Sequence, residues 1–231
     1  MSGHPLDNPA RAALLGPHAA FAERTGAALR YRPDVSPFLA LPDDPDPAAW
    51  RDAAALLGPG GTGLVAVPLD PPPGWATRLE LPGVQLVESG LAAAPDAEAI
   101  RLGPADVPEM LALTARTRPG PFLAGTVELG TYLGLRRDGA LVAMAGERLR
   151  PPGYAEISAV CTDPAWRGHG FGSRLIRAVA AGIRDRGETA FLHTGTGNAA
   201  ALRLYRALGF TLRRTTTFRL LGQDDPGRAA R

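Results

Sequence analysis

The sequence contains no lysine: all 25 basic residues of this 231-residue chain are arginines. A Walker-type phosphate loop, a Schiff-base enzyme and a kinase active site each need a lysine, so these classes are excluded. The formal net charge is only +2. A charge this close to balance argues only weakly for a nucleic-acid partner, and we expect none.

Cysteine and histidine are also scarce. Cys161 is the single cysteine, so no internal disulfide can form, and the four histidines are scattered along the chain. Their spacing matches neither a zinc site nor a His-Glu-x-x-His motif, so we expect no metal. We find no signal peptide and no apolar run of about eighteen residues, the length that a membrane helix needs. We therefore expect a cytoplasmic protein with no membrane partner.

Proline and glycine divide the first part of the chain into short elements. Asn8-Pro9 and Asp46-Pro47 are each typical of an N-cap followed by the first residue of a helix. Residues 63–69 predict a short buried strand, and residues 77–81 and 84–87 are further strand candidates. We find no chemical motif in this part.

The Ala- and Pro-rich stretch 92–98 is interpreted as a linker. We therefore expect a smaller α/β N-terminal subdomain over residues 1–96, a second domain over 97–222 and a flexible tail over 223–231. Strand and helix signals alternate in the first of these, so it is a candidate for a degenerate copy of the second.

The second part of the chain has clearer signals. Asp138-Gly139 lies between two alternating runs and predicts a hairpin over 131–145 with a type I′ turn. A strand over 154–162 leads through a glycine-rich loop into a helix with an apolar face. Further strands are expected at 99–102, 189–193, 210–214 and 216–220, and further helices at 107–114 and 199–208.

The stretch from Ile157 to Leu175 combines the end of a strand, a break at Asp163-Pro164 and the loop Arg-Gly-His-Gly-Phe-Gly at 167–172. A helix that starts after such a loop offers free backbone N–H groups and the positive end of its dipole, which suits a phosphate. Glycines let the phosphate approach the backbone. Arg167 and Arg174 are expected to add positive charge.

The same glycines could instead begin a dinucleotide fingerprint. That pattern needs a third glycine where this chain has Ser173, and only about 60 residues follow, too few for a doubly wound domain. We therefore set the dinucleotide interpretation aside.

The stretch resembles the acyl-CoA-binding motif of the GNAT superfamily of N-acyltransferases, Arg/Gln-x-x-Gly-x-Gly/Ala after a strand. Residues 198–210 resemble the family's second signature, in which Asn is followed seven residues later by Tyr and then by Leu-Gly-Phe. The resemblance covers about residues 97–221. It implies an α/β GNAT fold, with a mixed, mostly antiparallel sheet and helices on both faces, here preceded by the smaller N-terminal subdomain.

The resemblance also implies acetyl-CoA as co-substrate and assigns residues to it. The strand before the loop would splay from its neighbour and pair with the pantetheine arm, and the loop would cradle the pyrophosphate. Asn198 resembles the residue that contacts the cofactor near the pantetheine. The predicted acetyl-CoA-binding residues are Val160, Cys161, Thr162, Arg167, Gly168, His169, Gly170, Phe171, Gly172 and Asn198.

Three catalytic candidates follow from the resemblance. Tyr205 matches the general acid that protonates the leaving thiolate. Glu156, on the strand before the loop, is the first candidate for the base, and His193 is the second. Backbone N–H groups near Val160 or Cys161 would polarise the thioester carbonyl.

Each residue also has a structural interpretation. Tyr205 could be a core residue, Glu156 a solvent-facing strand residue and His193 a satisfied strand histidine. Asn198 could be an N-cap only, and Cys161 a small buried residue rather than a nucleophile.

The predicted function is transfer of an acetyl group from acetyl-CoA to a primary amine by direct attack. The alternative is a GNAT-like protein that binds acyl-CoA as a sensor or scaffold without turnover. The expected partners are a small-molecule or peptide amine and, at most, a second copy of the chain in a homodimer. We expect the loop over 117–130 and residues 1–96 to form the acceptor pocket.

Overall fold

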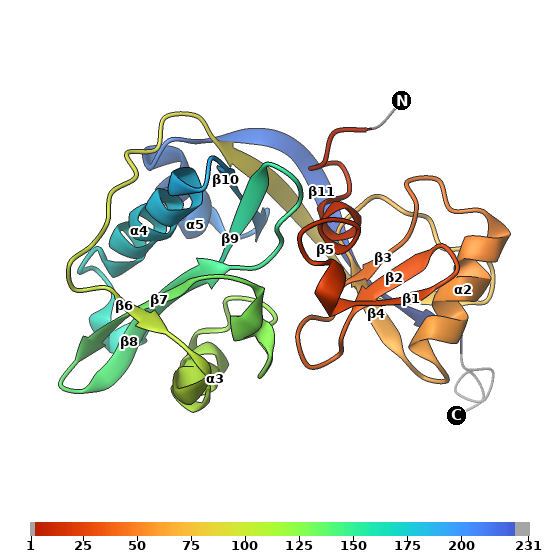
Figure 1. Cartoon of the computed structure of the whole chain (residues 1–231), viewed down its shortest axis with the longest axis horizontal. Helices are drawn as coiled ribbons and strands as arrows, with labels where there is room; N and C mark the ends of the chain where they lie inside the picture. Colours follow the sequence, from red (N-terminus) through yellow and green to blue (C-terminus); the bar gives the residue numbers. More distant parts are fainter. Residues whose placement is uncertain (1–2, 225–231) are drawn as a thin grey trace.

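The larger sheet of the molecule has eight strands in the order β4-β11-β5-β10-β9-β8-β7-β6 (Figure 1). The computed structural model describes residues 3–224. Neighbouring strands are antiparallel except for the parallel pair β9 and β10. The predicted sheet type is therefore confirmed. The strands are β4 (Thr62–Val65), β5 (Trp75–Glu88), β6 (Ile100–Leu102), β7 (Tyr132–Arg137), β8 (Ala140–Glu147), β9 (Tyr154–Thr162), β10 (Thr189–Gly195) and β11 (Phe210–Gln223).

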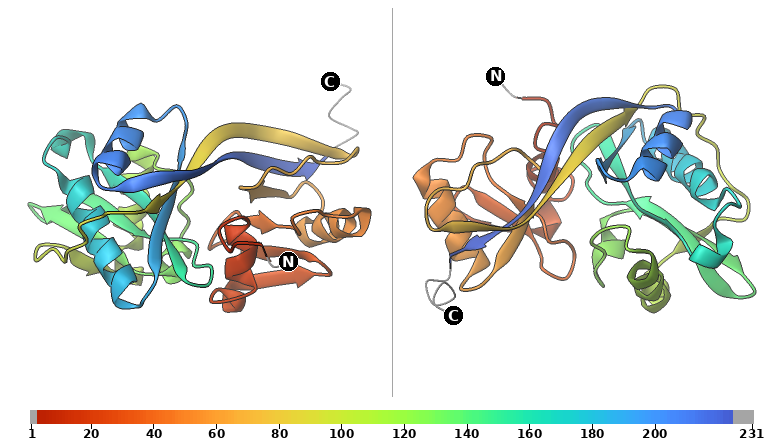
Figure 2. Two further views of the ribbon diagram at one scale, coloured as in Figure 1. Left: turned by 90° about the horizontal axis from the view of Figure 1, so that it is seen from above. Right: turned by 180° about the vertical axis from the view of Figure 1, so that it is seen from behind.

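Two strands of 14 residues each, β5 and β11, pair along their whole length and run from one half of the molecule to the other (Figures 1 and 2). The sequence predicted two shorter strands in each place, which is wrong. In β11 the register shifts between Leu212 and Arg214, so Arg213 is an extra residue in a β-bulge. β11 ends at Gln223, and residues 225–231 of the predicted tail lie outside the described residues.

Pro82 does not break β5, because it lies one residue beyond the last pair between β5 and β10, Gly83 with Gly195. Its carbonyl accepts from the N–H of Thr196, the residue after β10, at 2.9 Å. The nitrogen of Pro82 faces the same edge, beyond the end of β10, so no strand pairing is lost for want of its N–H. Gly83 in turn makes room for a ring: a Cβ there would lie 2.6 Å from Phe218.

The N-terminal unit is built on a separate three-stranded sheet, β1-β2-β3. The two N-caps are as predicted: the Asn8 and Asp46 side chains accept from backbone N–H groups of α1 and α2. The tight hairpin of β1 and β2 around Gly26 was not predicted. The elements are α1 (Pro9–Leu14), β1 (Ala22–Thr25), β2 (Ala28–Tyr31), β3 (Leu39–Ala40) and α2 (Pro47–Leu57).

Helices cover both faces of the large sheet, as the GNAT fold implies. On one face α4 (Phe171–Asp185) buries the predicted apolar stripe against residues such as Ala155 and Ile157, and α5 (Ala199–Ala207) joins the same core. On the other face α3 (Val107–Thr117) packs on Met144 and Cys161. Among residues 3–224, no helix has the length and apolar character needed to span a membrane.

The β7–β8 hairpin has the predicted turn, since Asp138 and Gly139 both have positive φ, 50° and 80°. The N-terminal unit and the large sheet share one apolar core, in which Leu14, Tyr31 and Phe38 pack with Leu149 and Phe191. The large sheet also takes β4 and β5 from residues before 97. The division into domains at residue 97 stays a prediction.

Candidate active site

The parallel strands β9 and β10 pair only at their start. The first three residues of β9 lie beside the first three of β10: Tyr154, Ala155 and Glu156 beside Thr189, Ala190 and Phe191. No later residue of β9 is paired with β10. β9 continues to Thr162, while β10 turns its other edge to β5. The two strands therefore splay, and the edge of β9 after Glu156 keeps backbone N–H and C=O groups without a partner strand.

A β-bulge lies in the part of β9 that is paired with β8 but not with β10. Ser158 pairs with Gly146 and Cys161 pairs with Met144, so two residues of β9, Ala159 and Val160, stand opposite one residue of β8. Ala159 has φ +51°, a left-handed conformation that is costly for a residue with a Cβ. The bulge reverses the alternation of side chains: Ile157 and Val160 both pack toward α4.

Cys161 and Ala159 consequently face α3. Burial raises the pKa of the Cys161 thiol to about 11, which keeps it protonated and unreactive at neutral pH. Its structural interpretation is the one that the geometry favours.

The loop at 167–172 leaves the start of α4 uncapped. Gly170 occupies the N-cap position with φ +74° and caps the helix with no side chain, and Gly168 has φ +84°. A Cβ at either glycine would meet nothing within 4 Å, so the space beside the backbone is open. Arg167 and His169 are exposed. The loop and helix start together form an accessible row of N–H donors.

Phe171 anchors this loop to the core. Its ring is buried, stacks on that of Trp166 and has the Arg137 guanidinium 4.8 Å from its centre.

Arg174 was expected to add positive charge at the loop, but its guanidinium contacts the linker instead. Its guanidinium donates two hydrogen bonds to Asp96, at 2.6 and 2.8 Å, which lower the pKa of that carboxyl to about 2. Arg174 thus fastens the linker to α4.

α5 carries the second pair of predicted residues. Asn198 is its N-cap, with the side-chain oxygen accepting from the Ala201 N–H at 3.1 Å. Tyr205 is buried on the inner face of the helix, with its ring edge-on to Phe210. Burial raises the pKa of Tyr205 to about 12, so its phenol stays protonated at neutral pH and can donate.

Three of these elements meet at Gly172, in the first turn of α4. A Cβ at Gly172 would lie 3.8 Å from Val160 in the bulge and 4.0 Å from Leu204, the residue before Tyr205. The bulge, the uncapped helix start and the turn of α5 that carries Tyr205 are therefore neighbours.

Glu156 and His193 lie together, on the face of the sheet opposite α4. The Glu156 carboxylate is fully buried and accepts two hydrogen bonds from Arg148, at 2.7 and 2.9 Å. It accepts a third from His193 Nδ1 at 2.7 Å. Burial alone would raise the pKa of Glu156, but the charge of Arg148 and the hydrogen bonds outweigh it and lower the pKa to about 2. Glu156 does not face solvent.

Gln85 fixes the tautomer of His193. The Gln85 side-chain nitrogen donates to the Leu6 carbonyl at 2.9 Å, and its oxygen accepts from Arg213 at 2.9 Å, so the amide can point only one way. The same nitrogen lies 3.1 Å from His193 Nε2. Nε2 must therefore accept, and Nδ1 carries the proton that is donated to Glu156.

The sequence singled out neither Arg148 nor Gln85. For Arg213 it indicated a solvated sheet edge, which is wrong, because the side chain is part-buried and donates to Gln85 at 2.9 Å. Arg213 continues the network to Asp7, at 2.7 Å. No motif marks these residues: Gln85 and Arg213 bond to residues far away in the chain, and Arg148 lies outside the strands, eight residues before its partner Glu156. The alternation of side chains along a strand could have assigned Arg213 to the face that carries Glu156 and His193. The bulge at Arg213, which was not predicted, interrupts this alternation.

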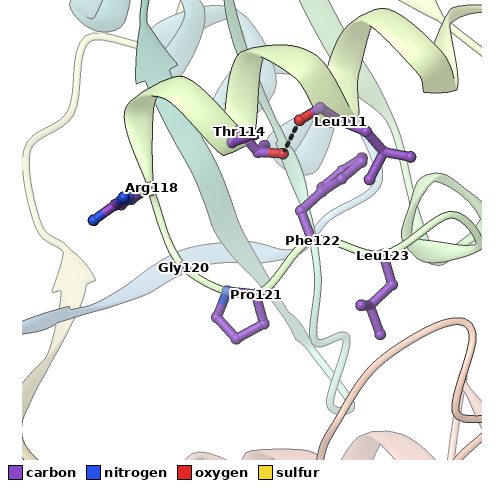
Figure 3. Close-up of a pocket in the computed structure, with 8 residues that line it drawn as sticks. Leu111, Thr114, Arg118, Gly120, Pro121, Phe122 and Leu123 are labelled. Atoms are coloured by element: carbon purple, nitrogen blue, oxygen red, sulfur yellow. Dashed lines mark hydrogen bonds between the residues drawn. The ribbon is translucent and has the colours of Figure 1, made fainter.

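An open pocket of about 460 Å³ lies at the C-terminal end of α3 (Figure 3). Its wall is mostly apolar, with Arg118 at one side, and Phe122 packs toward α3 (Figure 3). The pocket is lined by Leu111, Thr114, Ala115, Arg118, Gly120, Pro121, Phe122 and Leu123.

Within the part of the chain that the structure describes, no cluster of His, Cys, Asp and Glu could hold a metal ion.

The buried pair gives a stability prediction. Glu156→Gln leaves the Arg148 charge without its partner, and we expect the free energy of unfolding to fall by about 3–5 kcal/mol at pH 7. The folded-state pKa of about 2 lies below the ordinary 4.5, so the carboxylate contributes stability above pH 4.5 that is lost as the pH falls toward 2. Urea unfolding should show the two proteins converging over that range.

The control is Arg148→Met combined with Glu156→Gln. It removes both charges and should recover part of the lost stability. A gap between the wild type and Glu156→Gln that stays constant from pH 7 to pH 3 would contradict the charged state of Glu156.

Comparison with known proteins places this geometry in a family. The family model described as FR47-like protein matches residues 132–219. A solved GNAT-family structure from Novosphingobium aromaticivorans is 42% identical, covers 96% of this chain and 100% of its own, and superposes with a TM-score of 0.88.

Two curated relatives each match part of the chain. The N-alpha-acetyltransferase RimI of Mycobacterium tuberculosis is 40% identical over an alignment of 99 residues, and the match covers 40% of this chain and 61% of that protein. A mycothiol acetyltransferase of Thermomonospora curvata is 38% identical over 76 residues, 32% of this chain and 26% of that protein. The matches span less than two thirds of either relative. The full-length match to the solved structure, together with the splayed strands and the uncapped helix start, shows that the chain belongs to the GNAT superfamily.

Proposed function

We propose that the protein transfers an acetyl group from acetyl-CoA to a primary amine by direct attack. The observation that carries the proposal is the convergence at Gly172 of the β9 bulge, the uncapped start of α4 and the turn of α5 that holds Tyr205. The first supplies N–H donors for a carbonyl, the second N–H donors for a pyrophosphate, and the third an acid for a thiolate.

In this proposal the loop at 167–172 binds the pyrophosphate, and the free edge of β9 from Val160 to Thr162 pairs with the pantetheine arm. The neutral amine nitrogen attacks the thioester carbon. An N–H group at Val160 or Cys161 stabilises the oxygen on which negative charge develops. When the C–S bond breaks, the sulfur takes the proton of Tyr205, and the nitrogen gives up its own proton to a base.

Of the two predicted bases, His193 is the better proton acceptor. Both carboxylate oxygens of Glu156 are occupied, and a carboxylate with a pKa of about 2 is a weak base. His193 Nε2 keeps its lone pair toward the Gln85 amide, and Glu156 orients the ring. The His193 side chain is only 1% exposed, so Nε2 can accept the proton only after the Gln85 amide has moved aside.

His193→Gln tests this role. The glutamine amide keeps an N–H donor for Glu156 but offers no basic nitrogen, so we expect kcat to fall about 100-fold. The KM for acetyl-CoA should not change, because His193 lies on the face of the sheet opposite α4. Steady-state CoA release measures both, and urea unfolding confirms an intact fold. Turnover equal to that of the wild type would rule His193 out as the base.

Tyr205→Phe tests the enzyme and its acid together. Wild type should release CoA from acetyl-CoA with at least one of a panel of amines that includes peptides with a free α-amino group, the acceptor class suggested by the name of the RimI relative. Tyr205→Phe keeps the ring against Phe210 and should lower kcat about 100-fold with unchanged acetyl-CoA affinity.

The matched control is Tyr154→Phe, whose hydroxyl contacts His4 Nε2 at 3.1 Å rather than the convergence at Gly172. Its rate should equal that of the wild type. Acetyl-CoA binding without CoA release from any amine would instead support the alternative, a non-catalytic acyl-CoA sensor.

Gly172→Glu tests the anion cradle. A Cβ fits there at ordinary contact distances, and a carboxylate in the first turn of a helix is favourable to the fold. The same negative charge would repel the pyrophosphate, so we expect the Kd of CoA to rise at least about 10-fold with an unchanged or higher Tm. Titration calorimetry and thermal unfolding measure the two effects.

Gly182→Glu adds the same side chain to the same helix, at a position where a Cβ meets nothing within 4 Å. It lies far along α4 from the loop, and we expect normal CoA affinity. Equal affinity of both variants and the wild type would show that CoA does not bind at the start of α4.

For the acceptor, the pocket at the end of α3 supports the expectation that the loop over 117–130 contributes to the site. Its mostly apolar wall suits an amine with an apolar body. Arg118 makes no ion pair with any residue of 3–224, so its charge is open to an acidic group on the acceptor. The amine panel should therefore contain matched members with and without a carboxylate, and equal kcat/KM for both would rule out this role of Arg118.

A further inference from the structure

The hydroxyl of Tyr132 has no hydrogen-bond partner among the described residues, although the residue is only 1% exposed. Tyr31 provides a contrast, since it is equally buried and its hydroxyl contacts His18 Nδ1 at 3.0 Å. A buried hydroxyl without a partner costs about 1–3 kcal/mol relative to one with its hydrogen bond. The fold therefore gains packing from the ring of Tyr132 and nothing from its oxygen.

The ring lies across β8 in the direction of β9. Tyr132 pairs with Gly146 on β8, and Gly146 pairs with Ser158 on β9, directly before the bulge. A Cβ at Gly146 would lie between 2.2 and 2.5 Å from three carbons of the ring, so only glycine allows the ring to lie there. Since these three carbons already lie over β8, the hydroxyl at the far end of the ring reaches toward β9.

The charges that act on Tyr132 agree with this direction. Burial is the main reason why its pKa is raised, and Arg148, Glu156, Glu147 and Cys161 are the charged or titratable groups near enough to contribute. Glu156 and Cys161 flank the bulge on β9. The phenol therefore stays protonated, on the α3 face of the sheet and beside the bulge.

Tyr132 is also in contact with the wall of the open pocket. Phe122, which lines that pocket, packs edge-on against the Tyr132 ring with centroids 5.5 Å apart. Both rings belong to the apolar cluster under α3, together with Ala159 and Cys161. A molecule in the pocket is thus separated from the Tyr132 ring by the thickness of one side chain.

We propose that the Tyr132 hydroxyl binds the nitrogen of the acceptor amine beside the β9 bulge. This inference rests on the proposed function and adds a residue to it. A neutral phenol oxygen has two lone pairs and can accept a hydrogen bond from the amine N–H. That hydrogen bond turns the nitrogen lone pair toward the thioester carbon, whose oxygen lies at the N–H groups of the bulge.

Tyr132→Phe removes only the unpaired oxygen. If Tyr132 has only a structural role, activity should not change. Whether its role is structural or in amine binding, Tm should stay the same or rise, because the substitution removes a buried polar atom that has no partner. Our proposal predicts that kcat/KM for the amine falls about 10-fold or more, the effect of a lost hydrogen bond in a desolvated site. The KM for acetyl-CoA should stay the same.

Tyr31→Phe is the matched control, because its hydroxyl has a partner in the chain. It should lower Tm and leave kcat/KM within about 2-fold of the wild type, the opposite pattern. Equal kcat/KM for Tyr132→Phe and the wild type would overturn the inference while leaving the acetyltransferase proposal intact. A water molecule on the Tyr132 hydroxyl would give that same result.

If the wild type releases no CoA with any amine, the proposed function fails and binding decides the inference. The thermal shift that each amine of the panel causes in the presence of CoA would then be compared between wild type and Tyr132→Phe. A shift that is lost only in Tyr132→Phe supports amine binding at Tyr132. Equal shifts, or no shift with any amine, overturn it.

Discussion

The buried ion pair of Glu156 and Arg148 is the contact on which the arrangement of the two units depends. Glu156 lies on β9, and the guanidinium of Arg148 lies over the ring of Phe38 from the N-terminal unit. His193 and Gln85 extend the network to the Leu6 carbonyl before α1. Because each polar group is buried, loss of one leaves another unpaired, which costs more than an intact pair contributes. We interpret the network as a device that specifies how the N-terminal unit sits on the sheet rather than as a source of net stability.

The proposed active site is made where the sheet departs from regular pairing. β9 and β10 part after Glu156, the strained Ala159 shifts the alternation of β9, and α4 starts without a cap. Each departure leaves backbone N–H groups without an internal acceptor, which is unfavourable for the fold alone. The pairing of β5 and β11 over their full length, and the apolar face of α4, supply the stability that these departures need.

Local signals explain which features the sequence could predict. The caps at Asn8 and Asp46, the Asp138-Gly139 turn and the stripe of α4 each depend on residues close together in the chain, and each is found as predicted. β5 and β11 were each predicted as two strands, with gaps at residues 82–83 and at Thr215, whereas in the structure Pro82 pairs with Thr217 and Thr215 pairs with Val84 within continuous strands. The polar network was out of reach, since its members come from β5, β9, β10 and the residues after β8.

Two glycines clear opposite faces of the bulge, and this bears on the type of reaction. Gly172 opens the α4 face beside Val160, and Gly146 opens the α3 face for the ring of Tyr132. A thioester paired with the edge of β9 would thus have its sulfur on the α4 face and receive the amine from the α3 face, where Tyr132 lies. The nearest thiol, Cys161, is buried with its pKa raised to about 11, which makes an acyl-cysteine intermediate unfavourable. The geometry therefore favours a single transfer within a ternary complex over a two-step exchange.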